Sequence, residues 1–224
     1  MLKPKKKITK KELKKDPFLE FINDAQNWFS ERKKLIYRVA IGIAAVIIMI
    51  YLTGNSRANS NTEANALLGK AMLSQDLGDF ENSRFQLQSL IDDYSGTTAG
   101  KQGNYYLGKL LYDEADHAEA DKYLIDFIKK GETPELLTAA YKMLADIAQG
   151  NGNNDLAEEY YSKGAAIANG TVYSYEMTLL YANQLNINGK TDKALKIVNR
   201  ILEEDDLLFS TKKMAEELKG KIEG

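Results

Sequence analysis

The sequence of 224 residues contains no cysteine, a single histidine (His117) and three prolines. Without cysteine, the chain cannot form disulfides, use a thiolate nucleophile or bind a metal through thiolates. One histidine alone leaves a histidine-based zinc site or a hydrolase triad without its other members. The scarcity of proline among many alanines, leucines, lysines and glutamates favours helices. We therefore expect an all-α protein with no metal site.

Carboxylate pairs are present, but they are adjacent in sequence, as in Glu158-Glu159 and Glu203-Glu204. Neighbouring residues on a helix point about 100° apart, so such pairs are typical of solvated faces rather than of acid–base partners. The sequence therefore predicts no catalytic residues, no cofactor and no enzyme activity.

Charge is distributed unevenly along the chain. Residues 1–38 hold twelve Lys and Arg against five Asp and Glu, whereas the rest holds eighteen against twenty-seven. A basic head joined to an acidic body indicates that the two parts meet different environments.

An uncharged apolar run of fifteen residues, 39–53, follows the basic head. A membrane-spanning helix needs about 20 mostly apolar residues, and residues 35–53 reach that length if Arg38 extends its side chain back to the headgroups. Tyr37 and Tyr51 lie near the two ends, where interfacial aromatic residues belong. A cleaved signal peptide and a buried core helix are the alternatives. The long segment before the run disfavours the first, and its apolar character on every side disfavours the second.

Basic residues lie almost entirely on the N-terminal side of the predicted span, whose other side has Arg57 alone. The positive-inside rule then places the head, residues 1–34, in the cytoplasm. The acidic body is predicted to be extracytoplasmic, which in a bacterium means the periplasm beyond the inner membrane.

The head itself has the pattern of an amphipathic helix. Asp16-Pro17 is a typical helix start, with Asp as the N-cap and Pro in the first turn. The apolar residues that follow recur at three- and four-residue steps: Phe18, Phe21, Ile22, Ala25, Trp28 and Phe29. We expect Trp28 and Phe29, with Arg38 and Tyr51 further along, to meet the membrane interface. The alternative is a solvated tail whose lysines only set the orientation. No nucleic-acid-binding fold accompanies the lysines, so no nucleic-acid partner is predicted.

After a polar linker, residues 54–62, the remaining chain (63–224) repeats itself with a period of 37 residues. Four columns of equivalent positions stay in step across four units. They are the small residues Ala71, Gly108, Ala145 and Ala182; the turn residues Gly78, Ala115, Gly152 and Gly189; the small residues Ser83, Ala120, Ala157 and Ala194; and the apolar residues Leu87, Leu124, Tyr161 and Val198.

These columns predict units of two antiparallel helices joined by a glycine-containing turn. Small side chains allow the two helices to approach closely, and no unit can bury its apolar faces alone, so stability comes from stacking. Residues 210–222 have the pattern of a further helix that covers the last unit. The predicted body is thus a solenoid of four helical hairpins and a C-terminal capping helix, behind one transmembrane helix.

This pattern resembles the tetratricopeptide repeat, which has a Leu-Gly pair, an Ala about twelve residues later and a large apolar residue four beyond it. Leu107-Gly108, Ala120 and Leu124 match in that order. The period of 37 instead of 34 and the near absence of helix-terminating prolines, Pro134 being the nearest, are departures that longer loops between units would explain.

The resemblance implies that the chain binds other proteins in a groove lined by the first helix of each unit. Carried over by position, the groove residues are Leu68, Met72, Tyr105, Lys109, Tyr112, Lys142, Asp146, Leu179 and Asn183. Tyrosine offers apolar area with a polar tip, which suits contact with a peptide or protein.

The order of basic head, anchor and repeat domain resembles the bacterial ancillary subunit of the Sec translocon. That resemblance implies a scaffold beside the secretion channel, with translocon subunits and periplasmic folding factors as partners. A structural scaffold of the cell envelope or division machinery that self-associates through its repeats is the alternative.

Overall fold

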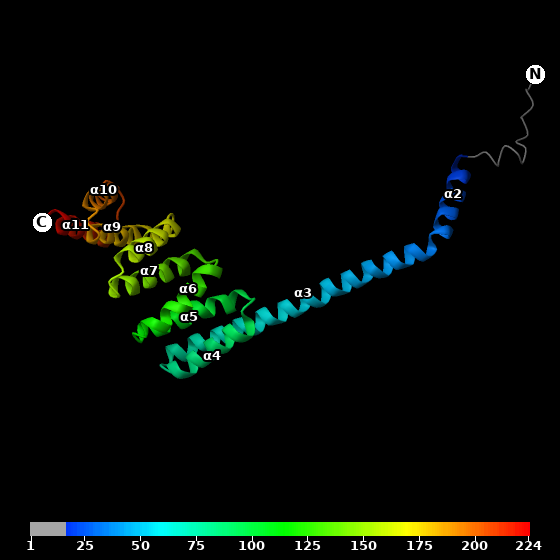
Figure 1. Cartoon of the computed structure of the whole chain (residues 1–224), viewed down its shortest axis with the longest axis horizontal. Coiled ribbons are helices and arrows are strands. Elements are labelled where there is room, and N and C mark those ends of the chain that lie inside the picture. The colour runs from blue at the N-terminus through cyan, green and yellow to red at the C-terminus, as the bar shows by residue number, and fades with distance from the viewer. Residues whose placement is uncertain (1–16) are drawn as a thin grey trace, which may run out of the picture. The chain divides into compact units, whose positions relative to one another are not determined.

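The computed structural model describes residues 17–224, apart from the side chains of Pro17 and of residues 51–57. All regular structure in the described part is helical, as predicted (Figure 1). The chain divides into two compact units, unit 1 (residues 1–57) and unit 2 (residues 58–224).

Unit 1 contains helix α2 (Pro17–Glu31) and the first part of α3 (Lys33–Asp76). The predicted helix start at Pro17 is confirmed, whereas Asp16 lies outside the described residues. The two helices meet at Arg32, where helical hydrogen bonding continues. The Arg32 N–H donates to the Trp28 carbonyl at 3.2 Å, and the Ile36 N–H donates to the Arg32 carbonyl at 2.9 Å.

Within the described residues, we find no helix with the length and apolar character needed to cross a bilayer. Tyr51 is predicted to meet the membrane interface at the C-terminal end of the span, but it lies outside the residues whose side chains are described. Helix α3 also runs without interruption through residues 54–62, the predicted linker. No proline occurs in that segment, and Gly54 is its only glycine, so its polar composition does not end the helix.

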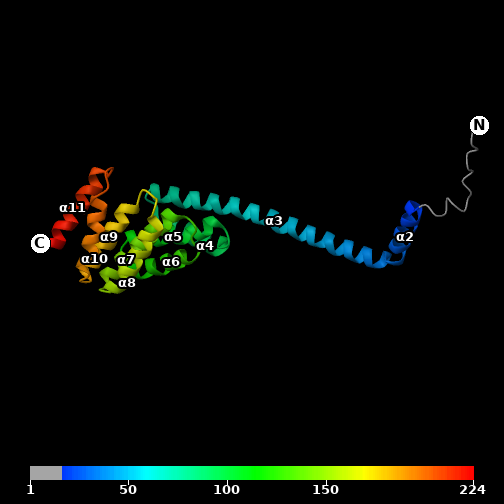
Figure 2. The same cartoon turned by 90° about the horizontal axis from the view of Figure 1, so that it is seen from above.

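Unit 2 is a stack of helical hairpins followed by one further helix (Figures 1 and 2). The four predicted repeat units and the C-terminal helix are all present. The hairpins are the end of α3 with α4 (Phe80–Tyr94), α5 (Thr98–Asp113) with α6 (His117–Lys130), α7 (Pro134–Gly150) with α8 (Asn154–Ala168), and α9 (Ser174–Ile187) with α10 (Thr191–Leu202), before α11 (Phe209–Glu223).

The predicted columns of small residues are buried where the two helices of each hairpin cross. Gly108 differs from the alanines of its column because a Cβ atom there would lie 2.8 Å from Cγ of Leu124. The hairpin of α5 and α6 therefore packs more closely than a methyl group allows. The apolar column that contains Leu124 is buried in every unit.

Hydrogen bonds roughly one repeat apart in sequence join neighbouring units. The Tyr123 hydroxyl donates to Gln88 at 2.8 Å, and Gln149 donates to the fully buried Gln184 at 2.7 Å. Because buried polar groups are costly without partners, such pairs fix how one hairpin sits on the next.

The four predicted turn residues all adopt the left-handed backbone conformation. Gly78, Gly152 and Gly189 have φ of 78°, 76° and 74°, and Ala115 has φ of 63°. Residues with a Cβ atom are disfavoured in the left-handed region, whereas glycine adopts it readily. The turn at Ala115, between α5 and α6, is therefore strained relative to the other three turns.

We expect Ala115→Gly to raise the free energy of unfolding by about 0.5–1 kcal/mol, because it relieves this strain. Gly152→Ala is the reciprocal control, since no atom lies within 4 Å of the place its Cβ would take and only the backbone conformation opposes the change. It should destabilise by about 1 kcal/mol. Urea unfolding followed by circular dichroism measures both, and equal signs for the two changes would contradict the strain argument.

Candidate protein-binding groove

The first helices of successive units lie next to one another, and we call their common surface the first-helix face. Helix α5 contacts α7, and α9 contacts α11. Lys221 on α11 donates to Asn183 on α9 at 3.2 Å, so α11 occupies the place of a fifth first helix. First helices of neighbouring repeats are thus in contact at α5–α7 and at α9–α11.

Asp146 on α7 is the centre of a hydrogen-bonded cluster on this face. Its Oδ2 accepts from the Tyr112 hydroxyl on α5 at 3.1 Å and from Lys142 Nζ at 2.9 Å. Its Oδ1 accepts from the Tyr161 hydroxyl on α8. One carboxylate therefore joins three helices from two units.

Burial raises the pKa of Tyr112 to about 12, and the nearby Asp146 carboxylate adds to the shift. The pKa of Tyr161 is raised further, by burial first and then by its hydrogen bond to Asp146. Both phenols consequently remain neutral donors to a higher pH than a free tyrosine does. Through these bonds the cluster holds α5, α7 and α8 together.

Two hollows open on the first-helix face on either side of this cluster. The first, about 340 Å³, lies between α3 and α5 and is lined by Gln75 and Lys109 among others. The second, about 250 Å³, lies between α9 and α11 and is lined by Leu179, Asn183 and Met214 among others. Both are small concave sites with mixed apolar and charged linings.

The predicted groove residues differ in how much surface they offer. Met72 and Lys109 are exposed, whereas Lys142, Asp146 and Asn183 are half-buried. Lys109 forms an ion pair with Asp113 one turn along the same helix. These side chains are available to a partner, although Lys142 and Asp146 also have structural bonds.

Leu68, Tyr105 and Leu179 are almost completely buried, with exposed fractions of 8%, 7% and 3%. They support the groove from inside, so little of their surface remains for a partner. Tyr105 packs against Tyr106 and Phe127, with ring centroids 5.1 and 5.4 Å away. Burial raises the pKa of Tyr105 to about 12.

Tyr161 belongs to the Asp146 cluster, although the sequence pattern assigns this residue to the core alone. Its ring fills the apolar column, while its hydroxyl reaches Asp146. Tyrosine at a position where the other units have Leu or Val is the signal that could have revealed it.

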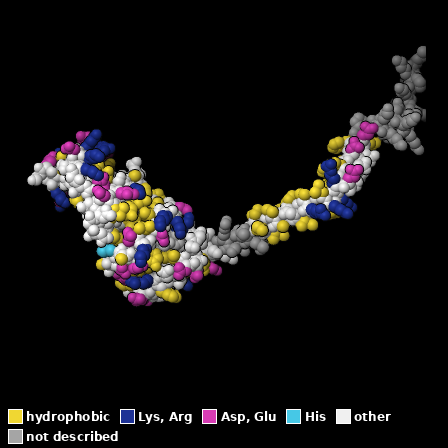
Figure 3. Space-filling model, in the orientation of Figure 1, with side chains coloured by type: hydrophobic (Ala, Val, Ile, Leu, Met, Phe, Trp, Pro, Cys, Tyr) yellow, Lys and Arg dark blue, Asp and Glu magenta, His cyan; other side chains and the backbone are white. Residues whose placement is uncertain are grey.

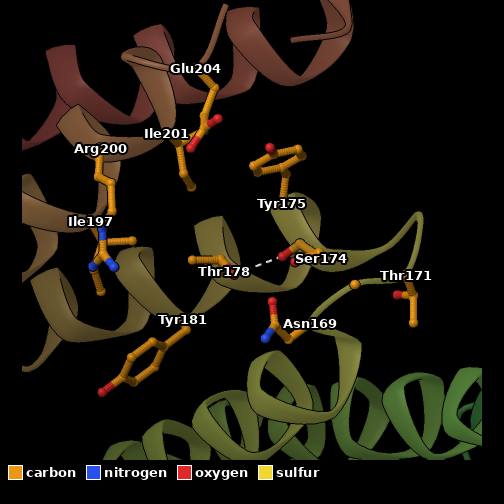
Figure 4. A pocket seen from close by; sticks show the side chains of 11 residues that line it. Asn169, Thr171, Ser174, Tyr175, Thr178, Tyr181, Ile197, Arg200, Ile201 and Glu204 are labelled. Atoms are coloured by element: carbon orange, nitrogen blue, oxygen red, sulfur yellow. Dashed lines mark hydrogen bonds between the residues drawn. The ribbon is translucent and has the colours of Figure 1, made fainter. Parts of the chain in front are cut away.

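A further cavity of about 640 Å³ lies outside the predicted groove, between α9, α10 and the loop that precedes α9 (Figure 4). Ser174, Tyr175 and Thr178 line it from α9, and Arg200 and Glu204 lie on the opposite wall. The Thr178 hydroxyl donates to the Ser174 carbonyl at 2.7 Å. Nothing in the repeat pattern indicates this cavity.

The residues predicted at the membrane interface belong to unit 1. Trp28, Phe29 and Arg38 are exposed there. The Arg32 guanidinium lies 5.1 Å from the centre of the Trp28 ring, within the range of a cation–π contact.

No cluster of three or more His, Asp or Glu side chains that could hold a metal ion occurs among the described residues. The ring of His117 packs against that of Tyr112, with centroids 5.3 Å apart.

The repeat domain has the tetratricopeptide-like fold of several solved structures. Nearly identical TPR-like repeats of a kinesin light chain from Podosopora anserina superpose with a TM-score of 0.56 at 15% identity, covering 72% of this chain and 86% of that one. YrrB, described as a TPR protein with an unusual peptide-binding site, superposes with a TM-score of 0.53 at 16% identity, covering 70% and 76%. No family model and no curated protein matches the sequence.

Proposed function

We propose that this protein is a protein–protein interaction scaffold that binds its partners along the first-helix face. The observation that carries this proposal is the pair of hollows on the first-helix face, one on either side of the Asp146 cluster. The fold is shared with YrrB, for which a peptide-binding site is described. Exposed Met72 and Lys109 provide apolar and charged contacts of the kind found in protein interfaces. We propose no catalytic activity and no cofactor.

We further propose that residues 35–53 anchor the chain in a bacterial inner membrane, with the repeat domain on the extracytoplasmic side. Apolar side chains point outward on all sides of α3 before residue 51: Val39, Ile41, Ile43, Val46, Ile47 and Ile48 are each more than half exposed. A helix that is apolar all round requires apolar surroundings. The basic residues on the N-terminal side support a cytoplasmic head.

Within this arrangement, we propose that the protein is an accessory factor of the Sec translocon or of periplasmic folding factors. Anchoring would raise the local concentration of the groove near the channel exit, so that weak contacts suffice. The second candidate is a cell-envelope or division scaffold that self-associates through its repeats. The small volume of the two hollows favours short segments of a partner chain in either case.

Photocrosslinking in intact cells tests the proposed function, with a photoreactive residue at Lys109, which is exposed and pairs only within its own helix. We expect crosslinks to translocon subunits or to periplasmic folding factors, identified by mass spectrometry. Lys129 on α6 is the matched control, because it is also an exposed lysine with an ion pair inside its helix.

The two positions separate the possible results. Equal crosslinking from Lys109 and Lys129 would contradict binding at the first-helix face. Crosslinks from Lys109 only to further copies of this chain, or to envelope and division proteins, would overturn the translocon proposal in favour of the structural scaffold.

A further inference from the structure

Helix α2 presents two sharply different faces. Phe21, Ile22 and Phe29 lie on one side, with exposed fractions of 70%, 40% and 58%. Glu20 and Asn27 lie on the opposite side of the helix. They are seven residues apart, so their side chains nearly align along the helix. Each comes two residues before a member of the apolar face, Ile22 or Phe29, so it points away from that face. Figure 3 shows hydrophobic side chains along one edge of α2 and acidic side chains elsewhere on it.

Basic residues flank this helix without occurring in it. No Lys or Arg lies within Pro17–Glu31, whereas Arg32, Lys33 and Lys34 follow directly, and eight lysines precede it in the sequence. Positive charge next to an apolar helix face matches a surface that combines anionic headgroups with acyl chains. The acidic residues of α2 are on the side that would face water.

We propose that α2 lies flat in the headgroup layer of an anionic bilayer, with its Phe21–Phe29 face towards the acyl chains and Arg32, Lys33 and Lys34 at the phosphates. The cation–π contact between Arg32 and Trp28 would place a guanidinium and an indole at the same depth, which is typical of membrane interfaces. The continuity of α2 with the exposed apolar part of α3 favours lipid over a protein groove as the occupant. The inference rests on the proposed membrane attachment and adds a second contact with the bilayer.

Trp28 is the only tryptophan in the chain, so its fluorescence reports on α2 without labelling. The protein, residues 1–224, would be reconstituted into vesicles of phosphatidylethanolamine and phosphatidylglycerol. We expect a blue-shifted emission, several-fold protection from aqueous iodide, and stronger quenching by lipids brominated near the headgroup than by lipids brominated near the chain ends.

Matched variants separate lipid insertion from a change of fold. Phe21→Asp puts a charge on the apolar face and is expected to restore much of the iodide quenching. Asn27→Asp puts the same charge on the polar face of the same helix and should leave the protection unchanged. Vesicles of neutral phosphatidylcholine should give weaker protection, because they lack the anionic headgroups that attract Arg32, Lys33 and Lys34.

Three results would overturn the inference. Flotation with vesicles while Trp28 remains open to iodide would remove the second contact and leave the proposed anchor intact. Loss of flotation altogether would remove both. Shielding of Trp28 in cells, but not in vesicles of the purified protein, would assign the apolar face of α2 to a protein partner.

Discussion

Replacing Gly100 by alanine is expected to lower the free energy of unfolding by about 3 kcal/mol, the upper end of what overpacking costs in a close-packed interior. A Cβ atom at this position would lie 1.9 Å from the Tyr94 carbonyl oxygen, a backbone atom at the end of α4. That carbonyl already accepts the Thr97 N–H at 2.9 Å and the Thr97 hydroxyl at 2.8 Å. Moving this carbonyl would disturb the turn that joins α4 of the first hairpin to α5 of the second hairpin.

Thermal and urea unfolding followed at 222 nm measure this effect, and Gly69→Ala is its control. Gly69 also lies inside a helix, but a Cβ atom added there would have no other atom within 4 Å. It should therefore gain about 0.5–1 kcal/mol from the better helix propensity of alanine. A Gly100→Ala protein as stable as the parent would contradict the packing of α4 against α5.

The repeat period could be predicted from the sequence because each column reports a constraint that recurs in every unit. Gly78 and Gly189 mark turns with positive φ, and Ala120 and Ala157 mark helix crossings without room for larger side chains. Because the same constraint recurs four times, the repeat can be recognised from local sequence alone, without knowledge of distant contacts. The C-terminal helix α11 was predictable for a different reason, because the exposed apolar face of the last hairpin needs a cover.

The groove was harder to predict, because position within a helix does not determine exposure. The repeat pattern assigns Leu68, Tyr105 and Leu179 to the groove by position, yet the stacking in this chain buries them. How far a side chain is covered depends on the neighbouring unit and on the length of the loop before it. Those quantities come from distant contacts, so they are absent from the local pattern.

Helix continuity was also missed, at residues 54–62. A segment rich in Asn and Ser favours loops when considered alone. Here the segment joins two strongly helical stretches, and extending an existing helix avoids a new nucleation step. Helix α3 therefore continues through it to Asp76.

We expect Asp146→Ala to lower the free energy of unfolding by about 2–3 kcal/mol, because it leaves the buried hydroxyl of Tyr161 without an acceptor. Tyr112 and Lys142 also lose their shared partner, but both are partly open to water and can be resolvated. Urea unfolding measures the loss. Asp113→Ala is the matched control, because its carboxylate is exposed and pairs only with a lysine of its own helix, and it should cost less than about 0.5 kcal/mol.

A double-mutant cycle with Tyr161→Phe tests whether the loss arises from this bond. If it does, Asp146→Ala should cost clearly less in the Tyr161→Phe background than in the parent, since no buried hydroxyl then remains unpaired. The pKa of Tyr161 is raised in the folded protein, so its hydrogen bond contributes fully below the ordinary tyrosine pKa of about 10 and is lost as the pH rises above it. The parent should therefore lose stability at alkaline pH more steeply than the Tyr161→Phe protein. Additive losses in the cycle together with identical alkaline profiles would show that Asp146 does not hold α7 and α8 together through Tyr161.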